Sequence, residues 1–333
     1  MPGESLALMV VVVLLALTFD FINGFHDTAN SIATSISTKA LPPRAAILLA
    51  SIMNFTGALT FTGVAKTIGG KIADPLNLEG GMYIVATALV AGIAWNLFTW
   101  YYGIPSSSSH ALIGSLTGAV IAAAGLKAVN FKGFLSIIEA LVISPVAAFT
   151  VGYAIMSFFK FILKNCHPAK VNRRFRVLQI FTAAWQAFSH GTNDAQKSMG
   201  IITFALVAGG FQSSLDVPLW VKVSCALAMA LGTSVGGWKI IKTVGSQIIR
   251  LEPANGFAAD FSSALVIITA TLIKLPVSTT HVISSSIMGV GAAKRVSAVK
   301  WTTAERIITA WMLTLPATAV TAALAYLLLS LVI

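Results

Sequence analysis

The chain has 333 residues, of which 56% are hydrophobic and 10% are charged, and its mean hydropathy is +0.85. Soluble globular domains carry charge on about a quarter of their residues, so this composition excludes an ordinary soluble protein. The net charge of +11 does not indicate a nucleic-acid partner, because Lys and Arg in the loops of a membrane protein set its orientation. The sequence predicts a multi-pass protein of the cell (inner or plasma) membrane, surrounded by the lipid bilayer.

Apolar runs of about 18 residues or more are typical of membrane-spanning helices. In chain order, the runs that reach or approach this length are Leu6–Phe19, Ala45–Val64, Tyr83–Tyr102, Leu135–Phe159, Leu219–Val235 and Ile307–Ile333. A backbone in lipid must satisfy its hydrogen bonds within each segment, so the predicted fold class is all-α. We expect about 10–12 membrane segments in total, because more polar segments lie between these runs.

Four motifs occur twice, in the same order, which indicates an internal duplication. The pairs are Asp27 with Asp194, Lys66–Gly69 with Lys242–Gly245, Pro105–His110 with Pro276–His281, and Pro145 with Pro316. The duplication divides the chain into a first transmembrane repeat (1–165) and a second transmembrane repeat (177–333). Between them lies a basic linker (166–176), which we expect on the cytoplasmic side.

The distribution of basic residues predicts that the two repeats have inverted topology. Met1–Ser5 and the segment from Ile307 to the last residue contain no Lys or Arg, whereas the linker region is rich in both. Because Lys and Arg favour the cytoplasmic side, both chain ends are expected outside, and each repeat crosses the membrane an odd number of times. Inverted repeats are common in secondary transporters, in which the substrate lies near the membrane midplane, between broken or re-entrant helices. We expect the Asp motifs and the Pro-Ser motifs to form those segments.

The Pro105–His110 and Pro276–His281 motifs predict two helix starts at membrane depth. Ser and Thr favour the N-cap position, and Pro fits the first turn. A helix N-terminus attracts anions, so two that meet would form an anion site without Arg or Lys. The predicted hydroxyl donors are Ser107, Ser108, Ser109, Ser278, Thr279 and Thr280. His110 and His281 are expected to orient the site by hydrogen bonding, and proton carriage by them stays open.

The Asp27 and Asp194 motifs predict a cation site, because a carboxylate inside a membrane is costly and is usually functional. Carboxylate, amide and hydroxyl oxygens suit hard cations. Sodium is the favoured ion, and protonation of the Asp side chains stays open. The predicted cation-binding residues are Asn23, Asp27, Asn30, Asn193 and Asp194, of which Asp27, Asp194, Asn30 and Asn193 bind Na+ directly, with support from Ser31 and Ser198.

Nearby residues have weaker predicted roles. Gly24 and Gly191 are expected to let the two helices break and free carbonyl oxygens. Lys197 either pairs with an acid or extends to the membrane interface. Asp20 and Asp260 are weaker candidates for the site.

Together these motifs resemble those of the inorganic phosphate transporter (PiT) family of sodium- or proton-coupled phosphate symporters. The resemblance is carried by Gly24–Asn30, Gly191–Lys197, both Pro-Ser-His motifs and Glu252–Asp260, and it covers essentially the whole chain. His26 and Lys197 stand where the family signature has Asn, which bears on the number and identity of the cations. The resemblance implies a homodimer in which a moving transport domain carries phosphate together with sodium.

The predicted function is therefore import of inorganic phosphate by symport with sodium, by a secondary active transporter. A proton-coupled permease for phosphate, metal–phosphate or sulfate, and an anion channel, stay open as alternatives. Catalysis is not expected, because Ser109 and His110 lack an orienting acid in their motif. No cofactor is predicted apart from the transported Na+, or H+ in its place.

Overall fold

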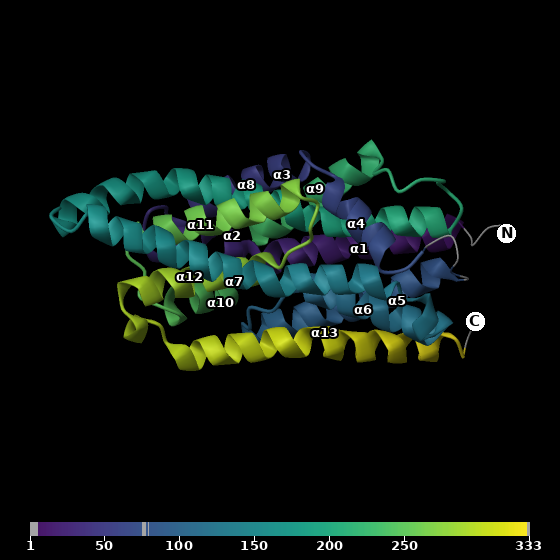
Figure 1. Ribbon diagram of the computed structural model, residues 1–333. Coiled ribbons are helices and arrows are strands. Elements are labelled where there is room, and N and C mark those ends of the chain that lie inside the picture. Colours follow the sequence, from purple (N-terminus) through teal and green to yellow (C-terminus); the bar gives the residue numbers. More distant parts are fainter. Residues whose placement is uncertain (1–5, 75–77, 79, 332–333) are drawn as a thin grey trace.

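The computed structural model describes residues 6–74, 78 and 80–331, and these residues form helices and no strands. Figure 1 shows the long helices lying side by side in one elongated bundle. The predicted all-α membrane fold is confirmed. In the first half the helices are α1 (Leu6–His26), α2 (Thr28–Ser37), α3 (Pro43–Ala58), α4 (Gly63–Lys71), α5 (Gly81–Tyr102), α6 (Ser108–Ala124), the short η2 (Leu126–Ala128) and α7 (Phe131–Ile162).

The second half contains a similar series. Its helices are α8 (Pro168–Ala208), α9 (Leu219–Val235), α10 (Trp238–Lys242), η3 (Thr243–Gln247), α11 (Pro253–Leu272), α12 (Thr279–Lys294), η4 (Val296–Ala298) and α13 (Trp301–Leu329). α6, η2 and α7 correspond to α12, η4 and α13. Pro145 lies inside α7 and Pro316 lies inside α13, so the duplicated prolines occupy matching helices.

Five segments of the described chain are long and apolar enough to cross a membrane, and seven are if each bent helix pair forms one span. α8 does not meet this hydropathy criterion because its 41 residues include a basic start and the polar motif around Asp194. α6 and α12 are shorter. When α6, α8 and α12 are added to these seven segments, the total reaches the lower end of the expected range of about 10–12.

The sharp bends lie a few residues before the lysine motifs and not at the Asp motifs. α3 and α4 meet at 69°, and α9 meets the Trp238–Gln247 segment at 65°. The first Asp motif is interrupted only at Asp27, between α1 and α2, and the second lies within the continuous helix α8. The expectation that both Asp motifs break their helices is therefore wrong for the second copy. Glycine allows a break but does not force one when backbone hydrogen bonds continue.

The two halves are interleaved. α6 packs against α13, and α12 packs against α7, so each short helix lies on the long helix of the other half. α1 and α3 of the first half likewise pack against α9 and α8 of the second. The two larger hydrophobic clusters of the described residues each contain side chains from both halves, and the division into two repeats stays a prediction.

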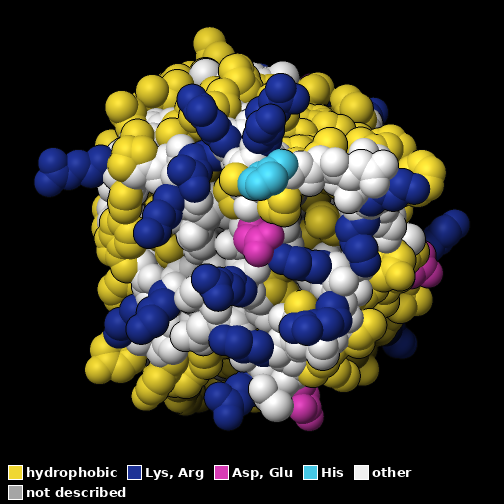
Figure 2. Space-filling view, turned by 90° about the vertical axis from the view of Figure 1, so that its left-hand side faces the viewer, with side chains coloured by type: hydrophobic (Ala, Val, Ile, Leu, Met, Phe, Trp, Pro, Cys, Tyr) yellow, Lys and Arg dark blue, Asp and Glu magenta, His cyan; other side chains and the backbone are white. Residues whose placement is uncertain are grey.

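One end of the bundle is strongly basic. The predicted linker is mostly helical, since α8 begins at Pro168 and contains residues 168–176. Its turn protrudes at the left in Figure 1, and Figure 2 shows many Lys and Arg side chains around that end. The exposed basic side chains of this turn are Lys164, Lys170, Arg173, Arg174 and Arg176. This bias predicts that the left end faces the cytoplasm. α1 begins and α13 ends at the opposite end.

Candidate functional site

The two Asp motifs and the two Pro-Ser motifs meet in the middle of the bundle. The α5–α6 and α11–α12 hairpins enter from opposite ends, and Figure 1 shows α6 and α12 on opposite sides of the centre. Their tips touch, because Ser109 Oγ donates a hydrogen bond to the Val277 carbonyl at 2.9 Å. Asp27 is 1% exposed and Asp194 is 0% exposed, so the protein encloses the site. The structure therefore brings together the predicted anion-binding and cation-binding residues.

Asp27 is surrounded by polar groups from three other segments. Its Oδ1 lies 2.6 Å from His26 Nδ1, and its Oδ2 accepts a hydrogen bond from Ser108 Oγ at 2.8 Å. Thr280 Oγ1 lies 3.4 Å from Oδ1. His26 is in turn oriented by Thr99 Oγ1 of α5, 3.0 Å from Nε2. His26, which stands where the family signature has Asn, thus places its imidazole against the Asp27 carboxylate.

Asp194 forms an ion pair with a lysine of its own helix. Lys197 Nζ lies 2.5 Å from Asp194 Oδ1, and both side chains are fully buried. His190 Nε2 lies 3.3 Å from Oδ2, which also accepts a hydrogen bond from Thr279 Oγ1 at 3.1 Å. His190, Asp194 and Lys197 share one face of α8 because their spacing is four and three residues. Lys197 therefore pairs with an acid and does not extend to the interface.

A metal ion could lie between the two acids. The potential ligand atoms of Asp27, His190 and Asp194 all lie within 4.8 Å of one another. His190 is outside the predicted ligand set. Its spacing of four residues from Asp194 on a helix is the sequence signal that would have included it.

The predicted asparagine ligands lie at the site but are used differently. Asn30 donates to Thr280 Oγ1 at 2.9 Å, and its Oδ1 has no hydrogen-bond partner among the described residues. Asn193 accepts from the Val277 N–H at 3.2 Å and donates to Thr271 Oγ1 at 3.0 Å. Asn193 therefore holds the loop before α12, and direct cation binding by either residue stays a prediction. Asn23 and the supporting residues Ser31 and Ser198 have buried polar atoms without partners in the described chain.

The hydroxyl groups form two classes. Ser107 and Ser278 are N-caps, and they accept hydrogen bonds from the backbone N–H groups of His110 and His281 at 3.1 Å and 3.3 Å. The remaining predicted donors are Ser108, Ser109, Thr279 and Thr280, and all have exposures of 1–2%. Three of these four contact an Asp carboxylate in this structure. Capping by Ser107 and Ser278 is thus a structural role, and the next residues face the acids.

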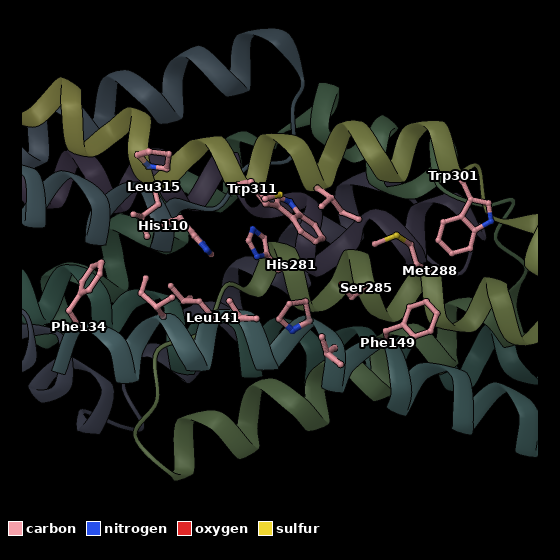
Figure 3. A pocket seen from close by; sticks show the side chains of 17 residues that line it. His110, Phe134, Leu141, Phe149, His281, Ser285, Met288, Trp301, Trp311 and Leu315 are labelled. Atoms are coloured by element: carbon pink, nitrogen blue, oxygen red, sulfur yellow. The ribbon is translucent and has the colours of Figure 1, made fainter. Parts of the chain in front are cut away.

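His110 and His281 lie together beside Trp311 of α13. Their ring centroids are 4.5 Å apart, and the His281 ring stacks on Trp311 at 3.9 Å. Figure 3 shows both imidazoles beside an apolar cavity between α7 and α13, with a volume of about 710 Å³. Trp311 also donates to the Pro105 carbonyl at 3.0 Å, which ties α13 to the first Pro-Ser loop. The histidines therefore support the hairpin tips.

Gly24 and Gly191 allow close helix contacts. A Cβ atom at Gly24 would lie 2.4 Å from the Met229 carbonyl oxygen, and one at Gly191 would lie 2.3 Å from the Asn54 carbonyl oxygen. Both contacts join the two halves of the chain. The expected role of these glycines as helix breakers is wrong, since neither ends its helix.

A second buried network surrounds Asp260. Its Oδ1 accepts from Thr34 Oγ1 at 2.6 Å and its Oδ2 accepts from Gln179 Nε2 at 3.3 Å. It lies between α2, α8 and α11, apart from the contacts of Asp27 and Asp194. Asp260 is therefore part of a satisfied polar network.

Comparison with known proteins identifies the family. The model of the phosphate transporter family matches residues 23–322. The chain belongs to the phosphate transporter family. A Bacillus subtilis (strain 168) protein named "Probable low-affinity inorganic phosphate transporter" is 59% identical over 328 residues, which cover 98% of both chains. A Rhizobium meliloti (strain 1021) protein of the same name is 44% identical over 321 residues, 96% of each chain.

A solved structure has the same fold. It is named "The sodium-dependent phosphate transporter", and it matches with a TM-score of 0.88 and 26% identity over 98% of this chain and 100% of that one. The predicted family is confirmed, and the protein is a phosphate transporter rather than an enzyme. It is a multi-pass protein of the plasma membrane.

Proposed function

We propose that this phosphate transporter imports inorganic phosphate by symport with sodium. The observation that carries the proposal is the meeting of Asp27 and Asp194 beside the starts of α6 and α12. Phosphate would lie at the two helix N-termini, whose N–H groups and dipoles favour an anion. Sodium would lie at the carboxylates. The sodium dependence in the name of the structural relative supports this choice of ion.

The hydroxyl contacts suggest how the two solutes are coupled. A hydroxyl group has one proton to donate, and Ser108 and Thr279 donate theirs to Asp27 and Asp194. When a cation neutralises the carboxylates, these hydroxyls are free to turn toward phosphate. Either solute alone would leave uncompensated charge at low dielectric, whereas the two together approach neutrality. Transport of one solute then requires the other.

The arrangement of the halves supports an inverted repeat and an alternating-access cycle. In Figure 1, α1 starts at the end where α13 finishes, and the α7–α8 turn lies at the other end, so α1 and α8 run in opposite directions. Rocking of inverted repeats around a fixed midplane site is a common transport mechanism. We further propose a homodimer, because α7 and α13 are little buried and surround an apolar cavity.

Proton coupling is the second candidate, with phosphate or a metal–phosphate complex as the solute. Two contacts favour proton coupling: Lys197 lies against Asp194, and His26 lies against Asp27. These groups occupy positions that a sodium ion would otherwise take beside each carboxylate, and they reduce the negative charge that attracts sodium. Protons would then serve as the coupling ion. Sulfate remains an alternative anion for the same helix starts.

Uptake into proteoliposomes tests the proposal. Labelled phosphate would be offered under a sodium gradient and a pH gradient imposed separately, with sulfate as competitor. We expect sodium-driven uptake by the wild type, and uptake at the level of empty liposomes for Asp27→Asn and Asp194→Asn. Asp216→Asn is the control, because Asp216 is exposed and pairs with Lys66. Near-normal sodium-driven uptake by both site variants would refute the assigned role, and uptake independent of any cation gradient would indicate a channel.

A further inference from the structure

Asp20 is the most unusual acid in the described chain. It lies on α1, about two turns before Asp27, and is 0% exposed. Four carboxylates are buried among the described residues, and Asp20 is one of them. The other three, Asp27, Asp194 and Asp260, each accept hydrogen bonds from other side chains. Among the described residues neither oxygen of Asp20 makes a hydrogen bond of normal geometry, and Ser198 is the hydroxyl that lies near it. A buried carboxylate without a partner is strongly unfavourable, so Asp20 holds either a proton or a cation beside it.

Two polar side chains near Asp20 also lack hydrogen-bond partners among the described residues. Ser198 of α8 lies beside its carboxylate. Asn23 lies on the same face of α1 as Asp20, because the two are three residues apart. The Oγ of Ser198 and both amide atoms of Asn23 lack partners in the described chain. These side chains are buried, so exposed solvent does not satisfy them.

A fourth polar residue, Asn96, lies on the neighbouring helix α5. A Cβ atom at Gly92 would lie 3.1 Å from the Phe19 ring, and His26 contacts Thr99 at 3.0 Å. The two contacts are seven residues apart on both helices, so α1 and α5 run side by side in register. Asn96 therefore lies level with Asn23. Both amide atoms of Asn96 are buried and unpartnered within the described residues.

We propose that Asp20, Asn23, Asn96 and Ser198 form a second cation site, separate from the pair of Asp27 and Asp194. The four residues supply one carboxylate, two amide oxygens and one hydroxyl, which are the ligands of a hard cation. A single carboxylate balances one positive charge, so the occupant is a monovalent ion, and sodium is the probe. Lys197 lies close enough to influence Asp20, but its ammonium is paired with Asp194.

The position of this second site gives it a role in transport. Asp20 lies between Asp27 and the end of the bundle where α1 begins, opposite the basic end in Figure 1. A cation entering from the outer side would reach Asp20 before Asp27. The inference thus deepens the proposed function, and it rests on cation-coupled transport.

Binding of radioactive sodium to the purified full-length protein tests the inference, with choline as the replacement cation. We expect Asp20→Asn to bind one sodium ion fewer than the wild type, and Asn96→Leu to bind that ion at least about tenfold more weakly. Asp216→Asn is the matched Asp-to-Asn control and should bind like the wild type. Melting in choline checks folding. Asp20→Asn should melt no lower than the wild type, because the amide removes a buried charge that lacks a partner.

Two results would overturn the inference. One is an Asp20→Asn variant that binds the same number of sodium ions with the same affinity as the wild type. The other is a wild-type protein that binds no sodium. The first result can occur while wild-type uptake is sodium-driven and Asp27→Asn and Asp194→Asn abolish it, so that failure of this inference is distinguishable from failure of the proposed function. The second result would overturn both.

Discussion

The two copies of the Asp motif have similar sequences but different structures. In the first copy the helix is interrupted at Asp27, and the neighbouring His26 contacts the carboxylate. In the second copy α8 continues through Asp194, and Lys197 supplies a positive charge from one turn later. The first motif thus has a one-residue interruption with an imidazole beside it, and the second has a continuous helix with an internal ion pair. The duplicated site is symmetric in position and asymmetric in charge.

Among changes that test this asymmetry, loss of the Lys197 ammonium should reduce the stability of the protein most. Lys197→Met leaves the buried Asp194 charge without its closest partner, and breaking a buried pair in this way costs about 3–5 kcal/mol. We expect a large fall in the melting temperature in detergent with choline as the only small cation. The double variant Lys197→Met/Asp194→Leu should recover most of the loss, because no unpaired charge is left. A single variant as stable as the wild type would contradict the pairing.

Alanine at the two motif glycines should destabilise both copies to a similar degree. The added methyl groups of Gly24→Ala and Gly191→Ala would meet backbone carbonyl oxygens, and such overpacking costs about 1–3 kcal/mol. Gly70→Ala is the control, because its methyl would meet only the end of the flexible Leu215 side chain, at 2.9 Å. Melting temperatures compare the three variants. Tolerance of Gly191→Ala would show that α8 has room to move away from α3.

Removal of the N-caps should have a smaller effect, and a slightly unequal one. Ser107→Ala and Ser278→Ala each lose a cap, which is worth about 0.5–2 kcal/mol. Ser107 should matter more, because its Oγ also lies 2.8 Å from His110 Nδ1. The Ser→Thr variants, which keep the hydroxyl, should retain most of the stability in the same melting assay. Equal losses from Thr and Ala would rule out a capping role.

The smallest effect is expected for the exposed pair of Lys66 and Asp216, which has no counterpart at Lys242 among the ion pairs of the described residues. Hydrogen bonding to Lys66 lowers the pKa of Asp216. Its contribution is therefore present above the ordinary carboxyl pKa of about 3.9 and is lost as the pH falls through the lowered value. Asp216→Asn should melt like the wild type near neutral pH. A salt-insensitive loss of stability there would contradict a screened surface pair.

Much of the site could be predicted from local sequence signals. The recurrence of Asp27 and Asp194 in apolar surroundings indicated paired acids, and the structure brings them together. The Ser107 and Ser278 caps follow from residue preferences that act within one helical turn. Lys197 and His190 were harder to assign, since a side chain three or four residues from an acid either pairs with it or faces elsewhere. Packing of the whole helix decides between the two.

Length, composition and duplication by themselves determined that this protein is a helical membrane protein with two related halves and polar motifs at membrane depth. These features depend on hydropathy and on interactions within a few residues, which a single sequence records. The tertiary structure decided that α3 and α9 end in sharp bends, that α8 continues through Asp194, and that Asp20 is buried without a hydrogen bond of normal geometry among the described residues. Those outcomes depend on contacts between helices far apart in the chain, and no local pattern encodes them.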